Sequence, residues 1–173
     1  MRIAYTIAPG KGDTDQLLYG FARKALTRGH RLCGAVQVNT DSCDGGLCDM
    51  DVKLLPEGPV IRISQSLGPS ATGCRLDPEA LEQAVGLVSS EVAKGADLLI
   101  VNKFGKHEAA GRGFRPVIAE ALSHDIPVLV GLNALNRAAF IAFTGDLAQA
   151  LPADEAALTA WFDAQIAERN APA

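Results

Sequence analysis

The amino-acid sequence predicts an α/β fold, a three-layer α/β/α sandwich whose mainly parallel sheet carries an inserted β-hairpin. Apolar runs of strand length alternate along the chain with amphipathic segments of helix length, which is the pattern of parallel strands joined by helical crossovers. Several of these runs are continuously apolar, as expected for strands that are buried on both faces. The 173 residues, 48% of them hydrophobic, suffice for one domain spanning residues 1–173.

The N-terminal segment predicts a strand, a glycine-rich loop and a helix. Residues 2–8 form an apolar run rich in β-formers, and the loop 9–14 follows it. From Asp13 onward apolar residues recur at helical spacing, and Gly29 supplies a typical C-terminal stop. Asp13 and Gln16 together resemble a capping box at the start of this helix.

The middle of the chain predicts a second strand, a hairpin and a second helix. Residues 31–38 form an apolar run, whereas residues 39–49 are too polar and glycine-rich for a regular element. Residues 50–63 then show two short β-forming runs separated by a proline-rich turn, which is typical of a hairpin. The pair Asp77–Pro78 predicts the N-cap and first turn of a helix that ends near Gly95.

The last part of the chain continues the alternation of strands and helices. Residues 97–104 and 126–132 predict two further buried strands, and residues 116–123 predict the helix between them. A short helix around residues 135–143 and a C-terminal helix from Asp154 complete the chain. Helices on both faces of a parallel sheet place any ligand beyond the carboxyl ends of the strands.

Charge and hydropathy exclude several classes of function. A formal net charge of -4 gives no general basic face for nucleic acid. The chain has no run approaching about 18 consecutive apolar residues, and its start lacks the apolar core of a secretory signal. We therefore expect a cytoplasmic protein that neither inserts into a membrane nor binds nucleic acid, so any anion site is local.

A basic, glycine-containing segment lies at the expected ligand edge. This segment, residues 102–115, carries Lys103, Lys106, Arg112 and Arg115 in an otherwise acidic protein. Arginine offers a bidentate fork to an oxyanion and lysine a mobile point charge. The alternative interpretation is a solvated surface loop, which is what a charged run of this composition usually forms. The position after a buried strand favours anion binding.

The loop 9–14 departs from the phosphate-binding loops of nucleotide hydrolases. Those loops combine small residues, a helix N-terminus, a lysine for the phosphates and a hydroxyl for Mg²⁺. When Gly12 and Thr14 are aligned with that motif, Asp13 occupies the position of the lysine. The strand that ends in a magnesium-binding carboxylate in such enzymes ends here in Asn102. Both replacements argue against hydrolysis, so we name no catalytic residue.

We therefore predict that fixed cations replace the metal ion at this edge of the sheet. The ligand is expected to be an anion held by backbone groups of the glycine loop and by cations of the basic segment. The predicted contacts are Gly10, Lys11, Gly12, Thr14, Asn102, Lys103, Lys106, Arg112 and Arg115.

Two stretches carry a resemblance to a known family. The segments DLLIVNKFGKHEAAGRGFRPVIAEAL and GCRLDPEAL, with the N-terminal glycine loop, resemble a bacterial domain family of unknown function. Its members are often described as nucleoside-triphosphatase-like or as related to molybdenum ABC transporters. The order of elements is more distantly similar to P-loop nucleoside triphosphatases. The resemblance implies a P-loop-like sandwich and a role near molybdate, tungstate or a phosphorylated molybdenum cofactor, with a homo-oligomer or a molybdenum-pathway protein as further partners.

Two other functions remain open on the sequence. The first is a magnesium-dependent nucleoside triphosphatase that uses Lys11 as its phosphate lysine and Glu108 as a replacement carboxylate. The second is a regulatory or adaptor module whose basic segment docks an acidic partner protein.

The cysteines allow, but do not require, a structural metal site. Cys43 and Cys48 stand close to the spacing of a metal-binding knuckle, and Cys74 or His30 would have to complete the site from a distance. Cys33 lies inside an apolar strand and is expected to be a buried thiol.

Overall fold

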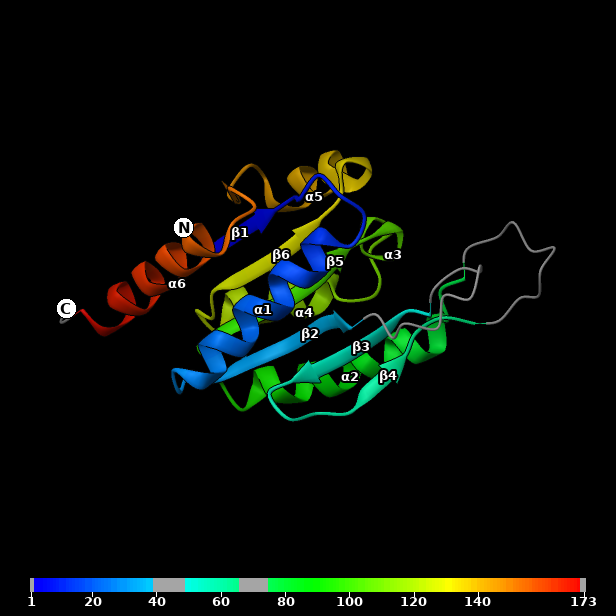
Figure 1. The fold of residues 1–173 in the computed structure, drawn as a ribbon, viewed down its shortest axis with the longest axis horizontal. Coiled ribbons are helices and arrows are strands. Elements are labelled where there is room, and N and C mark those ends of the chain that lie inside the picture. The colour runs from blue at the N-terminus through cyan, green and yellow to red at the C-terminus, as the bar shows by residue number, and fades with distance from the viewer. Residues whose placement is uncertain (1, 39–48, 66–74, 172–173) are drawn as a thin grey trace.

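The computed structural model describes residues 2–38, 49–65 and 75–171. In these residues a seven-stranded sheet has the order β4-β3-β2-β5-β6-β1-β7, with helices on both of its faces (Figure 1). The pairs β2–β5, β5–β6, β6–β1 and β1–β7 are parallel, whereas the hairpin pairs β2–β3 and β3–β4 are antiparallel. The strands are β1 Ile3–Thr6, β2 Leu32–Val38, β3 Asp51–Leu55, β4 Val60–Arg62, β5 Leu98–Phe104, β6 Val128–Leu132 and β7 Gln149–Leu151.

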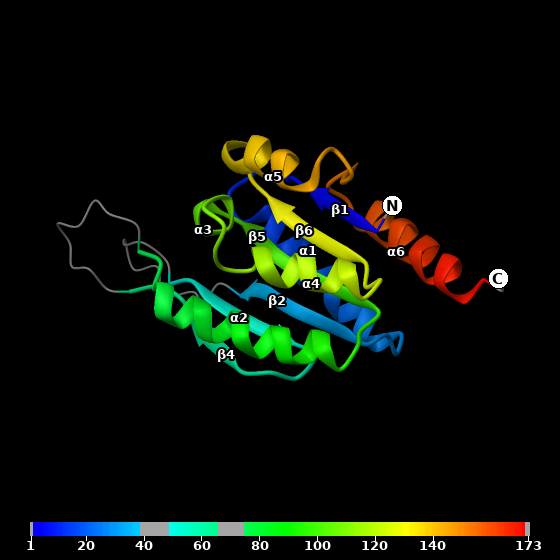
Figure 2. The same ribbon diagram turned by 180° about the vertical axis from the view of Figure 1, so that it is seen from behind.

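The helices form two layers, as the sequence predicts. Helices α1 and α6 lie in front of the sheet in Figure 1, and α2 and α4 lie in front when the molecule is turned around in Figure 2. The short helices α3, η1 and α5 lie near the carboxyl ends of the parallel strands. The helices are α1 Asp13–Thr27, α2 Pro78–Ala93, α3 Lys106–Ala109, α4 Arg115–Ser123, η1 Ala134–Asn136, α5 Arg137–Thr144 and α6 Glu155–Asn170.

Each face of the sheet carries its own hydrophobic core. Phe21 of α1 and Phe162 of α6 meet edge to face at 6.0 Å over one face. On the other face Val88 of α2 and Ile118 of α4 pack against alternate residues of β5. This arrangement explains the continuously apolar sequence of β5, because the strand buries side chains on both faces of the sheet.

Local signals in the sequence place most helix ends correctly. Asp77 caps α2 by accepting hydrogen bonds from the backbone of Glu79 and Ala80, and Gly29 follows α1 with a φ of 85°. The predicted capping box at Asp13 is wrong, since Gly12 is the N-cap of α1 and supplies no side-chain hydrogen bond.

Two short elements, β7 and α3, are not predicted by the sequence. β7 contains three residues, none of them fully buried, and α3 contains four. Neither is long enough to show a period in the sequence. Both are formed by their surroundings, β7 by pairing with β1 and α3 by following the end of β5.

Gly131 of β6 allows the central strands to approach each other at the carboxyl edge. A Cβ atom at this position would lie 2.1 Å from the backbone oxygen of Asn102 and 2.7 Å from the side chain of Leu18. Both contacts are far shorter than van der Waals contact, and one of them is to backbone. Glycine is therefore required where β6 passes β5 and α1.

We predict that Gly131→Ala lowers the free energy of unfolding by about 1 to 3 kcal/mol, because the added methyl group overpacks the core. Gly86→Ala is the matched control, since a Cβ on this exposed residue of α2 meets nothing within 4 Å and alanine is the better helix former. Chemical denaturation of both variants measures the difference. A Gly131→Ala protein as stable as the parent contradicts the close approach.

Candidate functional site

A cleft opens at the carboxyl edge of the sheet, where the sequence predicts the ligand. Its volume is about 500 Å³. Residues 7–12 and 14–15 of the β1–α1 segment form one wall, and residues 132–134 after β6 form another. Asn102 and Lys103 at the end of β5 line it between them. The cleft therefore brings together six of the predicted contacts, Gly10, Lys11, Gly12, Thr14, Asn102 and Lys103.

The loop that borders this cleft is closed by its own side chains. Asp13 folds back and its carboxylate accepts a hydrogen bond from the backbone N–H of Gly10 at 3.1 Å. The hydroxyl oxygen of Thr14 accepts one from the backbone N–H of Ala8 at 3.0 Å. Gly12 adopts the left-handed conformation with a φ of 86°, which glycine tolerates without strain. These two hydrogen bonds hold the shape of the loop from within.

A buried polar pair joins the first turn of α1 to the end of β5. The side chain of Asn102 donates to the carboxylate of Asp15 at 2.7 Å, and both residues are 4% exposed. The ammonium of Lys103 lies 3.9 Å from the second oxygen of Asp15 and donates to Gln37 at 3.5 Å. A buried carboxylate needs such partners, because its transfer out of water is costly.

Asn102 keeps one unused hydrogen-bonding group. Its amide oxygen is buried and has no partner among the residues that the structure describes. Buried polar atoms normally find a partner, so this acceptor is an exception. This acceptor lies on a residue that lines the cleft.

The four cations of the basic segment do not share one pocket. Lys103 lines the cleft, whereas Arg112 lines a separate hollow formed with α2. The guanidinium of Arg115 lies 4.5 Å from the ring centre of Phe143, and Lys106 is an exposed residue of α3. The expectation that Lys106, Arg112 and Arg115 join Lys103 around one anion is not what the structure shows.

Glu108, the carboxylate considered for magnesium, holds its own turn together. It is buried, and its two oxygens accept hydrogen bonds from the backbone N–H groups of Gly105 and Phe114 at 2.8 and 3.1 Å. The first contact closes the N-terminus of α3, and the second joins α3 to Phe114, the N-cap of α4. A carboxylate engaged in this way stabilises the turn and is not directed at a metal in the cleft.

Asp15 is the site residue that sequence reasoning missed. It directly follows the loop and is the carboxylate that lines the cleft in the described residues. The available signal was its place in the first turn of α1, one residue after Thr14. Asn133, which follows β6 and also lines the cleft, was missed for lack of any motif.

The cysteine hypothesis falls largely outside the described residues. Cys43, Cys48 and Cys74 all lie there, and among the described residues no three His, Cys, Asp or Glu side chains are arranged to hold a metal ion. His30 packs edge to face against Phe162 with ring centres 4.8 Å apart. Cys33 is buried as predicted, and burial, assisted by the negative charge of Glu91, raises the pKa of its thiol to about 12.

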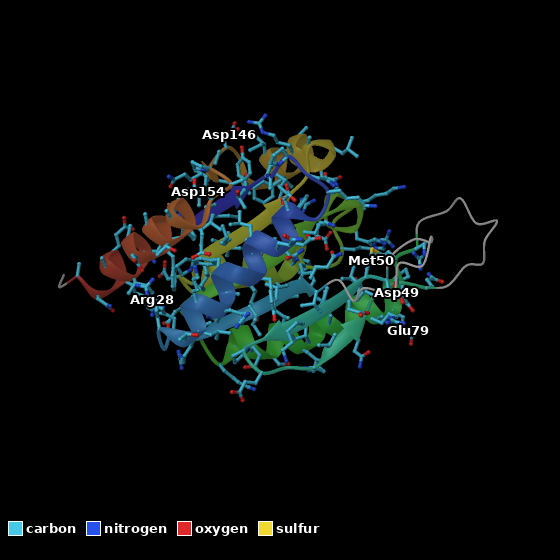
Figure 3. All side chains as sticks on the ribbon, viewed as in Figure 1. Arg28, Asp49, Met50, Glu79, Asp146 and Asp154 are labelled. Carbon is cyan, nitrogen blue, oxygen red and sulfur yellow. The ribbon has the colours of Figure 1, made fainter. Side chains whose placement is uncertain are left out.

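Asp49 is engaged at the outer part of the same edge. It pairs with Arg62 at 3.0 Å and with Arg75 at 3.3 Å. A hydrogen bond to Asp51, together with the charges of Asp49 and Asp51, raises the pKa of Arg62. Figure 3 shows Asp49 beside Met50 at the start of β3. These ion pairs use arginines of the hairpin and of the segment before α2, not the cations of residues 102–115.

No helix in the described part of the chain combines the length and apolar character that crossing a bilayer requires.

Comparison with solved structures confirms the predicted fold. The crystal structure of THEP1 from the hyperthermophile Aquifex aeolicus has a TM-score of 0.65 at 15% identity, covering 99% of this chain and 100% of that one. The solution structure of a human cancer-related nucleoside triphosphatase has a TM-score of 0.60 at 18% identity, covering 98% of each chain. The fold is that of the P-loop nucleoside triphosphatases.

One relative is named as a molybdenum import protein. The molybdenum import ATP-binding protein ModC 2 of Bradyrhizobium diazoefficiens is 37% identical over 161 residues, which is 93% of this chain. The match spans only 18% of the length of that relative.

Residues 3–161 match the model of a family described as "Protein of unknown function (DUF2478)", and the chain belongs to this family.

Proposed function

We propose that the cleft binds a compact anionic group without efficient hydrolysis. The candidates are a molybdate-type or tungstate-type oxyanion and the phosphate of a nucleotide or of a phosphorylated molybdenum cofactor. The observation that carries the proposal is the placement of Lys11 and Lys103 on one cleft beside the N-terminus of α1. Two cations and the positive end of a fifteen-residue helix favour an anion at this point, and Asp13 and Asp15 in the first turn of that helix offset part of this charge.

The side chains around the cleft argue against metal-assisted hydrolysis. Asp13 has replaced the loop lysine, and its carboxylate is bound to the backbone of Gly10. Asn102 stands in place of a metal-binding carboxylate and donates to Asp15 instead. The Thr14 hydroxyl oxygen, the atom that holds Mg²⁺ in P-loop enzymes, already accepts a hydrogen bond from Ala8. Binding without hydrolysis requires only the cations and the backbone groups that line the cleft.

The molybdenum context selects the first ligands to test. A relative that matches most of this chain is named for molybdenum import and ATP binding. Because the chain covers a small part of that relative, the link supports a role in molybdenum metabolism only as part of this proposal. Molybdate and tungstate are compact oxyanions that suit two lysines without a metal ion.

Two alternatives each have one observation in their favour. A magnesium-dependent nucleoside triphosphatase is favoured by the fold, with Asp15 rather than Glu108 as the carboxylate at the cleft. An adaptor that docks an acidic partner is favoured by the exposure of Lys106 and Arg112 outside the cleft. The two experiments below separate both alternatives from simple anion binding.

We predict that at least one of five ligands, molybdate, tungstate, phosphate, ATP and GTP, raises the melting temperature of the protein. The increase should be the same with and without Mg²⁺. A ligand at 100 times its Kd stabilises the fold by about 2.7 kcal/mol. Lys103→Ala should weaken binding of that ligand by about tenfold or more, since it removes a charged contact. Thermal-shift titration of the purified chain gives both values.

Arg112→Ala is the matched control for this titration, because it removes a cation of the same segment that lines a different hollow. It should bind as the parent does. Equal weakening by both variants restores the four-cation site predicted from the sequence. The absence of a thermal shift with all five ligands rejects the proposed function and favours the adaptor.

We predict that Asp15→Asn strengthens anion binding by about fivefold, because it removes a negative charge about 4 Å from Lys103 while the amide keeps a partner for Asn102. Under the triphosphatase alternative the same change instead abolishes magnesium-dependent turnover. Calorimetric titration and a phosphate-release assay on the same preparation distinguish the two results.

A further inference from the structure

A second, mostly apolar pocket lies next to the cleft. Its volume is about 180 Å³, and it lies between the ends of β2 and β5, the start of β3 and the start of α2. Its apolar lining includes Met50, Val52, Ile63, Leu76, Leu81 and Phe114. Met50 stands at the carboxyl edge in Figure 3, so the pocket belongs to the same end of the molecule as the cleft.

Asn102 and Lys103 line both the cleft and the apolar pocket. The ammonium of Lys103 lies 3.9 Å from Asp15, which lines the cleft, and 3.5 Å from Gln37, which lines the pocket. This cation therefore stands at the boundary between the two. An anionic group bound to Lys103 is within a few bonds of the apolar pocket.

The polar groups of the pocket are few. Glu108 also lines it, but both of its oxygens accept backbone hydrogen bonds. The side chain of Asn102 bonds to Asp15 on the α1 side of the sheet, so Lys103 and Gln37 are the polar side chains at the boundary of the pocket. Binding sites for small molecules typically combine an apolar lining with a small number of polar groups that fix orientation. The pocket and its boundary have this composition.

We propose that the ligand of this site is a compact anion joined by a short link to one aromatic or heteroaromatic ring. Lys11 and Lys103 hold the anion in the cleft, and the ring fills the apolar pocket. A cavity of about 150 Å³ is known to hold a benzene molecule, so the pocket matches a single ring. The inference rests on the proposed function, because it names the class of ligand for the same cleft.

The test compares methyl phosphate with phenyl phosphate on the full chain. The two monoesters share one anionic group and differ in the ring. Isothermal titration calorimetry should give a Kd for phenyl phosphate lower by about tenfold or more, because the ring leaves water for an apolar surface. Lys103→Ala should weaken both esters by the same factor.

Leu76→Ala tests the position of the ring. It removes apolar lining from the pocket and should reduce the preference for phenyl phosphate severalfold while leaving methyl phosphate unchanged. Leu87→Ala is the matched control, since this leucine of α2 is 42% exposed and lines a different hollow beside the β3–β4 turn. It should keep the full preference.

Met50→Trp provides an independent variant that fills the pocket from its half-buried rim. It should remove the preference for the ring and leave methyl phosphate binding intact.

Equal binding of the two esters by the parent overturns the inference while the proposed anion site stands. Binding of neither ester also overturns the inference, whereas the proposed anion site falls only if the five-ligand titration shows no thermal shift. A ring preference that survives both Leu76→Ala and Met50→Trp places the ring elsewhere and also overturns the inference.

Discussion

The hydrogen bond between Asp15 and Asn102 is the contact on which the geometry of the cleft depends. It connects the first turn of α1 to the end of the central strand β5, and both side chains are almost fully buried. If Asn102 lost its amide, the carboxylate would remain buried with only the distant ammonium of Lys103, and leaving a buried charge uncompensated is strongly destabilising. The pair therefore fixes the loop wall of the cleft against its β5 wall.

The same pair sets the charge that the cleft offers to a ligand. Asp15 lies 3.9 Å from the ammonium of Lys103 and offsets part of its positive charge. The positive potential in the cleft therefore comes from Lys11, from the part of the Lys103 charge that is not offset, and from the N-terminus of α1. P-loop enzymes obtain a stronger field from a divalent ion and a loop lysine. Under the proposed function this weaker field favours reversible binding, because it would give less stabilisation to the charge that develops during phosphoryl transfer.

The sequence allowed the fold to be predicted because its signals are local and repeated. The continuous apolar run of β5, the cap at Asp77 and the stop at Gly29 each predict their element without knowledge of the others, and the structure contains all three. Elements that are too short to give a periodic pattern could not be predicted in this way. The short elements β7 and α3 exist through contacts with their neighbours and leave no period to detect.

The grouping of cations within residues 102–115 could not be derived from the sequence. Charge and position predicted a basic edge, and Lys103 does line the cleft. The direction of each later side chain depends on the turn after α3, where Gly111 and Gly113 adopt positive φ values of 87° and 59°. These angles redirect the chain, so that Arg112 faces α2 and Arg115 covers Phe143. Spacing in the sequence carries no information about that change of direction.

The replacement of the loop lysine by Asp13 has a further physical consequence. In a phosphate-binding loop the backbone N–H groups donate hydrogen bonds to the anion. Here the Asp13 carboxylate accepts the hydrogen bond from the N–H of Gly10. This hydrogen bond holds the loop from within, which would reduce the conformational entropy lost on binding. An incoming anion must either displace the carboxylate or rely on the lysines beside it. Displacement would place two negative charges in one turn, so we propose that an anion binds on the lysine side of the cleft, next to Asn102 and the apolar pocket.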